Sequence, residues 1–305
     1  MSSQVWLITG ASNGFGLLLA LKALAAQHRV IGTVRSKTKS ADAVRQITSA
    51  GGQVIELDMT CPQAAVIAAV RDAEKLHGQI DILVNNAGYS ILGAIEQFRN
   101  SIIQPRPWRN EEEVKLQYQT NVYGPLFTTQ GVLPGMRARG GGFIVNMSSG
   151  AGQDAGATRG LYGASKFALE GFSEALSAEV AEFGIAVLVV EPGMFRTNFF
   201  HALQTPDAPL PAAYGPGSAV GMTMGMFEAL TGTQRGDPQR AVDRIYEVVT
   251  GTGLAGRLRG EVLRLPLGMD AVERIEAKQK RVLGEVAEAK KLEEQQSTAF
   301  PAEKD

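Results

Sequence analysis

A tyrosine and a lysine stand four residues apart in the run Leu161 to Lys166. The apolar pattern of the segment that follows predicts a helix, in which residues four apart lie one turn apart on the same face. A lysine ammonium beside the Tyr162 phenol favours the phenolate, so Tyr162 and Lys166 could act as a general acid and base near neutral pH. The same spacing is common on solvated helix faces. The rest of the chain must therefore decide between the two interpretations.

A glycine-rich loop joins the first apolar run, Val5 to Thr9, to a stretch with a helical pattern, Leu17 to Gln27. Glycines let the backbone turn tightly and come close to a ligand, and the N–H groups at a helix start favour a pyrophosphate. A purely structural turn is the alternative. We expect the loop to bind a dinucleotide through Gly10, Ser12, Asn13, Gly14, Phe15 and Gly16.

Basic residues follow the second predicted strand, Arg29 to Val34, where a dinucleotide fold presents the adenosine ribose. No acidic residue stands in the run from Arg35 to Lys39 to accept a hydrogen bond from the ribose 2′-hydroxyl. The guanidinium of Arg35 can instead make paired hydrogen bonds to a 2′-phosphate. Basic residues that are simply exposed would look the same. We favour NADP as the cofactor in preference to NAD.

Strands and helices alternate along the chain, which predicts an α/β fold with a parallel sheet and helices on both faces. About seven strands are expected in one doubly wound, Rossmann-type domain, because neither a linker nor an internal repeat divides the chain. Asp58, at the end of the third strand, could accept from an adenine amino group or cap the next helix. Asn86 is expected to stabilise the sheet. Further strands and helices are predicted at 53–58, 62–77, 79–84, 142–147, 162–183, 185–190 and 261–265.

Composition narrows the classes of partner. The 305 residues are 44% hydrophobic and 20% charged, with a formal net charge of −1. This balance gives no electrostatic basis for binding nucleic acid or an anionic membrane. Cys61 is the single cysteine, and the three scattered histidines lack the spacing of metal ligands, so we expect no disulfide and no metal. Neither a signal segment nor a membrane span is predicted, which makes a cytoplasmic location the expectation.

Six motifs occur in one order along residues 4 to 200, and together they resemble the short-chain dehydrogenase/reductase family. They are Thr9 to Gly16, Asn85 to Gly88, Asn121, Ser148-Ser149, Tyr162 to Lys166 and Pro192-Gly193. The resemblance implies a Rossmann architecture to about residue 268. It also implies an NADP(H)-dependent oxidoreductase that interconverts a carbonyl and an alcohol on a small to medium apolar molecule. Enzymes of this fold that reduce C=C or C=N bonds, and a non-catalytic nucleotide-binding sensor or scaffold, are the alternatives.

The resemblance assigns roles to individual residues. Tyr162 becomes the general acid and base, and Lys166 lowers its pKa and binds the nicotinamide ribose. Ser149, thirteen residues before the tyrosine, holds the substrate oxygen; Ser148 takes this role if the register is shifted by one. Asn121 anchors a water molecule. Further cofactor contacts are implied for Asn85, Ala87, Gly88, Pro192, Gly193 and Thr197, and the helix over 162–183 is expected to pair in a homodimer or homotetramer.

Three segments fall outside the motifs. The link over 98–110 is longer than is usual for the family and is either a solvated loop or a contact to the pocket or a second subunit. The apolar, methionine-rich segment at about 194–239 occupies the position of a substrate lid. We expect residues 1–268 to form the catalytic domain and 269–305 a charged, solvated helix and tail, for which we predict no function, with 297–305 disordered.

Overall fold

A computed structural model of the chain describes residues 3–98, 109–295 and 298. Most of the long link predicted over 98–110 and most of the C-terminal tail lie outside these residues. No helix among the described residues is long and apolar enough to cross a membrane.

Seven strands form one sheet in which every neighbouring pair is parallel. The strands are short apolar runs because a parallel sheet is buried on both faces, as the fully buried β1 illustrates. Their bounds are β1 (Val5–Ile8), β2 (Arg29–Val34), β3 (Gln53–Glu56), β4 (Ile82–Asn85), β5 (Gly142–Met147), β6 (Ile185–Pro192) and β7 (Arg264–Leu267). The predicted α/β fold with a doubly wound parallel sheet is confirmed.

In the strand order β3-β2-β1-β4-β5-β6-β7, the first strand of the sequence lies inside the sheet, next to the central β4. The chain builds outward from β1 through β2 to β3, then returns to the other side of β1 with β4. Beside β1 and β4 the direction of winding reverses, and ligands of open α/β sheets bind at the carboxyl ends of the strands at this point. The glycine loop follows β1, and Asn85 to Gly88 follow β4, so the fold brings these two motifs together.

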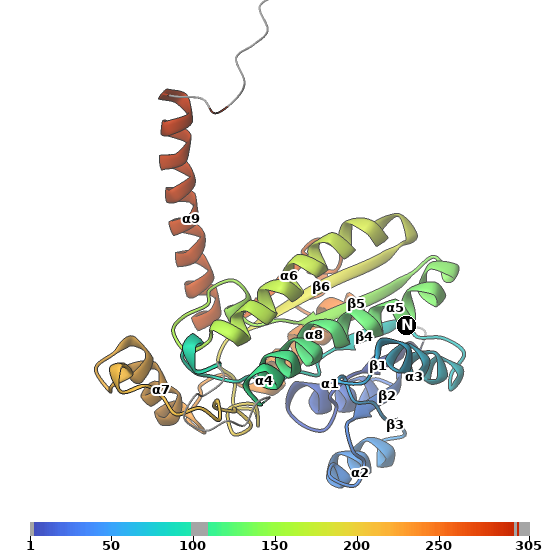
Figure 1. Ribbon diagram of the computed structural model, residues 1–305. Coiled ribbons are helices and arrows are strands. Elements are labelled where there is room, and N and C mark those ends of the chain that lie inside the picture. The colour runs from blue at the N-terminus through green and yellow to red at the C-terminus, as the bar shows by residue number, and fades with distance from the viewer. Residues whose placement is uncertain (1–2, 99–108, 296–297, 299–305) are drawn as a thin grey trace, which may run out of the picture.

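Helices cover both faces of the sheet (Figure 1). Their bounds are α1 (Gly14–Ala25), α2 (Ala41–Ser49), α3 (Gln63–Lys75), α4 (Arg109–Tyr118), α5 (Gly124–Arg139), α6 (Gly160–Val180), α7 (Ala219–Leu230), α8 (Pro238–Thr250) and α9 (Met269–Gln295). One core cluster joins α1 and α8 to the sheet through Leu19 and Val242, and a second joins α3, α5 and α6 through Val70, Met136 and Leu176. The two clusters clamp the sheet from opposite sides.

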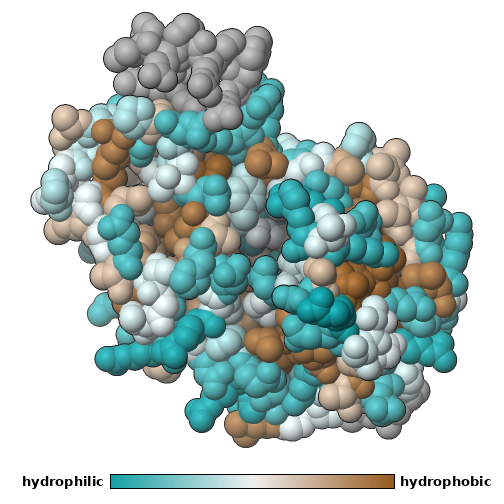
Figure 2. Space-filling model, turned by 90° about the horizontal axis from the view of Figure 1, so that it is seen from below, coloured by the Kyte–Doolittle hydropathy of each residue, from teal (hydrophilic) through white to brown (hydrophobic). Residues whose placement is uncertain are grey.

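The outer surface is mixed in character. On the face shown in Figure 2, hydrophobic residues lie in separate patches between hydrophilic ones. Large apolar side chains exposed elsewhere in the described chain include Met222 and Met226 of α7.

Helix α9 differs from the expectation of a wholly solvated segment. Its distal part projects away from the domain (Figure 1), but its first turns pack against the domain. Ala271 is fully buried, and the Asp270 carboxylate accepts a 2.8 Å hydrogen bond from the Met194 backbone N–H. A side chain on Gly193 would collide with the same carboxylate. The first turns of α9 therefore pack with the catalytic domain, although the predicted boundary at residue 268 separates them from it.

Candidate active site

The glycine loop has a conformation that favours glycine at its tightest points. Gly10 and Gly14 have positive φ angles of 65° and 54°. A side chain on Gly10 would lie 2.8 Å from the Ala87 Cα, and one on Gly16 would collide with the Asn86 amide. Helix α1 starts at Gly14, earlier than the predicted Leu17, because Phe15 and Gly16 already belong to its first turn. The loop and the segment after β4 therefore pack backbone to backbone.

The start of α1 fits an anionic ligand. Asn13 is the N-cap residue, but its side chain makes no capping hydrogen bond and instead donates to the Ser12 hydroxyl at 3.3 Å. No acidic residue lies in the first turn. Uncapped N–H groups and the positive end of the helix dipole are the features that bind a pyrophosphate.

The two asparagines after β4 have different roles. Asn86, expected to stabilise the sheet, donates to the carbonyls of Thr9 and Gly10, so it fixes the glycine loop, and it also lines the pocket. The side chain of Asn85, which was predicted to contact the cofactor, points into the protein interior. Its buried side chain donates to Asn146 Oδ1 at 2.8 Å and accepts from the Thr128 hydroxyl at 2.6 Å. These bonds join β4 to β5 and α5, so we assign the Asn85 side chain to the sheet interior rather than to the cofactor.

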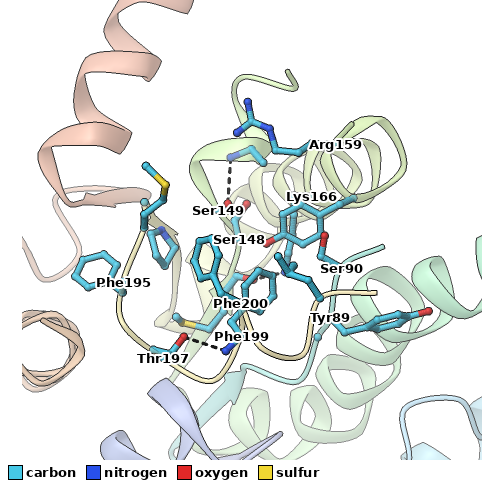
Figure 3. A pocket seen from close by; sticks show the side chains of 18 of the residues that line it. Tyr89, Ser90, Ser148, Ser149, Arg159, Lys166, Phe195, Thr197, Phe199 and Phe200 are labelled. Atoms are coloured by element: carbon cyan, nitrogen blue, oxygen red, sulfur yellow. Dashed lines mark hydrogen bonds between the residues drawn. The ribbon is translucent and has the colours of Figure 1, made fainter. Parts of the chain in front are cut away.

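Tyr162 and Ser149 meet inside one pocket, although they come from α6 and from the turn after β5. The Ser149 side chain is close enough to the Tyr162 phenol to lower its pKa, and the Ser149 hydroxyl accepts from the Ala151 N–H at 3.1 Å (Figure 3). Ser148 also lines the pocket, but its hydroxyl is buried beside Gly152 and Glu170, without a hydrogen-bond partner among the described residues. The contact with Tyr162 favours Ser149, the residue selected by the spacing.

Lys166 lies over the phenol ring of Tyr162, with its Nζ 5.8 Å from the ring centroid. Nζ donates to the Met147 carbonyl at 2.7 Å. Asn121 approaches the same place, because a side chain on Gly88 would lie 3.0 Å from Asn121 Oδ1 and 3.7 Å from Lys166 Nζ. Gly88 thus leaves the room in which these polar groups come together.

Asn121 sits in a turn of π-helix, Gln119–Tyr123, between α4 and α5. Such turns widen the helix and often occur at functional sites. The fully buried Asn121 side chain donates to the Tyr89 carbonyl at 3.0 Å and to the Ser165 hydroxyl at 3.1 Å, and accepts from the Tyr89 N–H at 3.2 Å. The π-turn therefore holds Asn121 against both the segment after β4 and helix α6.

Burial changes the acidity of both titrating groups. It raises the pKa of Tyr162 to about 12, against the opposing effects of the Ser149 hydrogen bond and the Arg159 charge. It lowers the pKa of Lys166 to about 8, which the Glu170 carboxylate opposes. Burial thus favours the neutral form of both the phenol and the amine.

Aromatic side chains form one wall of the pocket. Phe199 packs on Tyr162 with ring centroids 5.9 Å apart, and Phe200 links Phe199 to Phe227 of α7. Phe15 of the glycine loop meets Phe195 at 5.4 Å. Phe195, Phe199, Phe200 and Phe227 come from the segment expected to be a lid, so this segment lies beside Tyr162 in the pocket.

The remaining predicted contacts divide between the pocket and the surface. Pro192, Gly193 and Thr197 line the pocket, and the Thr197 hydroxyl accepts from the Phe199 N–H at 3.3 Å. Arg35 is exposed directly after β2. The loop after it is fastened by Glu56, whose carboxylate accepts from the Lys37 N–H at 2.7 Å.

Asp58 does not cap the next helix, and its expected contact with an adenine amino group stays a prediction. One of its carboxylate oxygens accepts from the N–H and the hydroxyl of Thr60, at 2.9 and 2.8 Å, in a turn that precedes α3. Pro62, rather than Asp58, is the N-cap residue of this helix. Asp58 therefore shapes the loop at the end of β3.

Two arginines in the pocket were not predicted. Arg159 lies one turn before Tyr162 at the start of α6, a spacing that could have identified it. Arg274 comes from α9, and its Nη2 donates to the Asp154 carbonyl at 2.9 Å. No local pattern marks Arg274, because its approach depends on how α9 packs against the turn after β5.

A family model for short chain dehydrogenases matches residues 4–208. This chain belongs to the short-chain dehydrogenase family. The match spans every motif from the glycine loop to Thr197, in agreement with the predicted resemblance. The protein is thus an oxidoreductase of a family that binds a nicotinamide cofactor, and the cradle around Gly10 and Gly16 fits such a dinucleotide.

Individual relatives agree with the family. The oxidoreductase claN of Passalora fulva is 43% identical over 198 residues, which are 65% of this chain and 84% of claN. The structure of a short-chain dehydrogenase from Streptomyces avermitilis is 37% identical, with a TM-score of 0.82, and the match covers 98% of this chain and all of that one. A metagenomic short-chain oxidoreductase in complex with NADP is 31% identical, with a TM-score of 0.55, over 64% of this chain and 85% of that one.

Proposed function

We propose that this protein is an NADP(H)-dependent oxidoreductase that interconverts a carbonyl and an alcohol on a small to medium apolar substrate. The convergence of Tyr162, Ser149 and Lys166 in one pocket carries the proposal. The same pocket includes Asn86 and Phe15 beside the glycine loop, so a hydride carrier held by that loop would face the phenol. The nicotinamide supplies or accepts the hydride when it is bound.

Tyr162 acts as the proton donor in carbonyl reduction. Its pKa of about 12 keeps the phenol protonated at neutral pH, which is the form that reduction requires. The Ser149 hydroxyl holds the substrate oxygen against the phenol and stabilises the negative charge that develops there. Oxidation requires the phenolate, which the charges of Arg159 and Lys166 favour.

The Lys166 ammonium has hydrogen-bond donors that are available to ligands. An ammonium has three N–H groups, and the Met147 carbonyl engages one of them. The others can bind ribose hydroxyls and a water molecule held near Asn121. Such a water would pass protons between Tyr162 and solvent.

The apolar wall defines the character of the substrate. Phe199, Phe200 and Phe227 give the pocket a non-polar side next to Tyr162. We assign residues 194–239 as a lid that excludes water when the substrate is bound.

The test of activity is a screen of ketones and aldehydes for loss of NADPH absorbance, with the wild type and Tyr162→Phe side by side. The wild type should turn over apolar carbonyl compounds, and Tyr162→Phe should lose most of this activity while still binding NADPH. Turnover that survives in Tyr162→Phe, or a protein that binds NADPH but is inert on every carbonyl, would contradict the proposal.

The cofactor preference has its own test. Arg35 is exposed directly after β2, where an NADP 2′-phosphate would lie, and a relative was solved with NADP bound. Arg35→Ala should raise the KM for NADPH far more than the KM for NADH. Arg45→Ala on α2, an exposed arginine paired with Asp42, is the matched control and should change neither. Equal effects of Arg35→Ala on both cofactors would show that Arg35 does not read the 2′-phosphate.

A further inference from the structure

The substrate end of the pocket carries positive charge without a matching acid. Three cationic side chains line it, from Arg159, Lys166 and Arg274, whereas none of the described lining residues is acidic. Lys166 is engaged by the Met147 carbonyl and stands on the cofactor side of Tyr162 in the proposed function. The two arginines remain to be explained.

Arg274 is already paired. Its Nε lies 3.4 Å from Asp154 Oδ2, and its Nη2 donates to the Asp154 carbonyl. The Asp154 carboxylate thus offsets one of the two positive charges. The pair of arginines and the single aspartate leave a net charge of about +1 at this end of the pocket.

Arg159 is not paired. Its Nε is buried and has no hydrogen-bond partner, and its guanidinium forms no ion pair with any described residue. Burial and the nearby Arg274 charge lower the pKa of Arg159, and the Asp154 charge only partly opposes them, so its surroundings disfavour the charged guanidinium. Leaving a buried donor unpaired costs free energy that an anionic partner would recover.

The position of Arg159 relative to the reacting group is set by the helix. Arg159 is the N-cap residue of α6 and precedes Tyr162 by three residues, close enough for its charge to act on the phenol. In the view of Figure 3, Arg159 and the rings of Phe199 and Phe200 lie on opposite sides of Ser149. A substrate whose oxygen contacts Ser149 would therefore have one end toward the guanidinium and the other toward the aromatic wall.

We infer that the substrate is an oxo acid or hydroxy acid with an apolar body, and that Arg159 binds its carboxylate. This inference rests on the proposed function and specifies its substrate class. A carboxylate carries a single negative charge, which matches the net charge of the two arginines and Asp154. The planar guanidinium can bind a carboxylate through two parallel hydrogen bonds.

The kinetic test uses straight-chain oxo acids that differ in the distance between ketone and carboxylate, each compared with its methyl ester, with NADPH as reductant. The wild type should prefer at least one acid over its ester in kcat/KM. Arg159→Met should lower kcat/KM for that acid by about 10-fold to 100-fold, the range for a hydrogen bond between charged groups, and lower kcat/KM for the ester far less. Arg159→Lys should retain part of the preference.

Arg240→Met is the matched control, because Arg240 is an exposed arginine on α8 outside the pocket. It should leave both substrates unchanged. The inference is overturned if the wild type has the same kcat/KM for each ester as for the corresponding acid. So would an equal loss on acid and ester in Arg159→Met, which would indicate a structural role for the arginine.

A binding measurement separates this inference from the proposed function. Calorimetry on the NADP-loaded protein compares nonanoate, which cannot react, with nonanamide. Nonanoate should bind more tightly, and Arg159→Met should abolish the difference. If no ketone is turned over but this preference is present, the proposed reaction fails and the carboxylate site stands. Equal binding of both compounds refutes the site, whatever the activity.

Discussion

Glu191 at the end of β6 offers a direct test of the electrostatics beneath the active site. Its side chain is 1% exposed, next to the equally buried Glu170 of α6. Arg264 lies between them, with its Nε 2.9 Å from Glu170 Oε2 and 3.8 Å from Glu191 Oε1. Burial and the Glu170 charge raise the pKa of Glu191 to about 7, against the opposing charge of Arg264.

The sign and size of the effect follow from this pKa. Between its ordinary pKa of 4.5 and about 7, Glu191 binds more protons in the folded chain than in the unfolded chain. Stability is therefore lost as pH rises through this window, and the full cost is present above about pH 7. A difference of about 2.5 units corresponds to about 3 kcal/mol at most.

The perturbation is Glu191→Gln, which keeps the shape and removes the charge. It should raise the free energy of unfolding by about 2 to 3 kcal/mol at about pH 8.5, and change it little at about pH 5, where the wild-type carboxyl is protonated in the folded chain. Urea unfolding of both proteins at the two pH values measures this difference.

Glu174→Gln is the control, since Glu174 contacts the same Arg264 at 2.8 Å but is largely exposed. It should not produce the stabilisation at high pH. The reasoning is refuted if Glu191→Gln changes stability equally at both pH values, or destabilises the protein at about pH 8.5.

Three further predictions concern the catalytic groups and the core. Ser149→Ala should lower kcat by about 100-fold with little change in cofactor affinity, as measured by steady-state kinetics and NADPH titration, because it removes a donor to the developing charge. The kcat/KM for alcohol oxidation should rise with pH over the range below the Tyr162 pKa of about 12, because oxidation requires the phenolate. The kcat/KM for carbonyl reduction should not change with pH near neutrality. A flat pH profile for oxidation would contradict the role of the phenol. Leu83→Ala, at a fully buried position of β4, should cost about 2 to 5 kcal/mol of stability in urea unfolding, and a loss below about 1 kcal/mol would contradict close packing at the sheet centre.

Local patterns were sufficient for most of the fold. Short apolar runs alternate with helical periodicity, and each run lies near the position of an observed strand, from β1 to β7. Element ends were predicted less well. The first helix starts at Gly14 instead of Leu17, and β7 covers Arg264–Leu267 instead of 261–265. Glycines caused the first difference, because Gly14 and Gly16 suggest a loop by composition although α1 already includes them.

The candidate site was predicted to the extent that its members share a local element. Tyr162 and Lys166 are four residues apart on one helix, so helix geometry alone places them together. Ser149 was selected by its spacing from the tyrosine, and its contact with the phenol agrees. The pKa of Tyr162 could not be predicted from local spacing. Desolvation raises it, and this desolvation comes from the packing of segments that are remote in the sequence.

The sequence by itself determined the order of strands and helices, the glycine loop after β1 and the placement of Tyr162 and Lys166 one turn apart on α6, because each depends on residues close together in the chain. Only the tertiary structure decided that Asn85 points into the sheet interior while Asn86 holds the loop, since this depends on which face each residue takes as β4 ends. Only the tertiary structure brought Arg274 to Asp154, across 120 residues of chain. Contacts of that kind arise where two surfaces pack, and a linear pattern carries no record of which surfaces will meet.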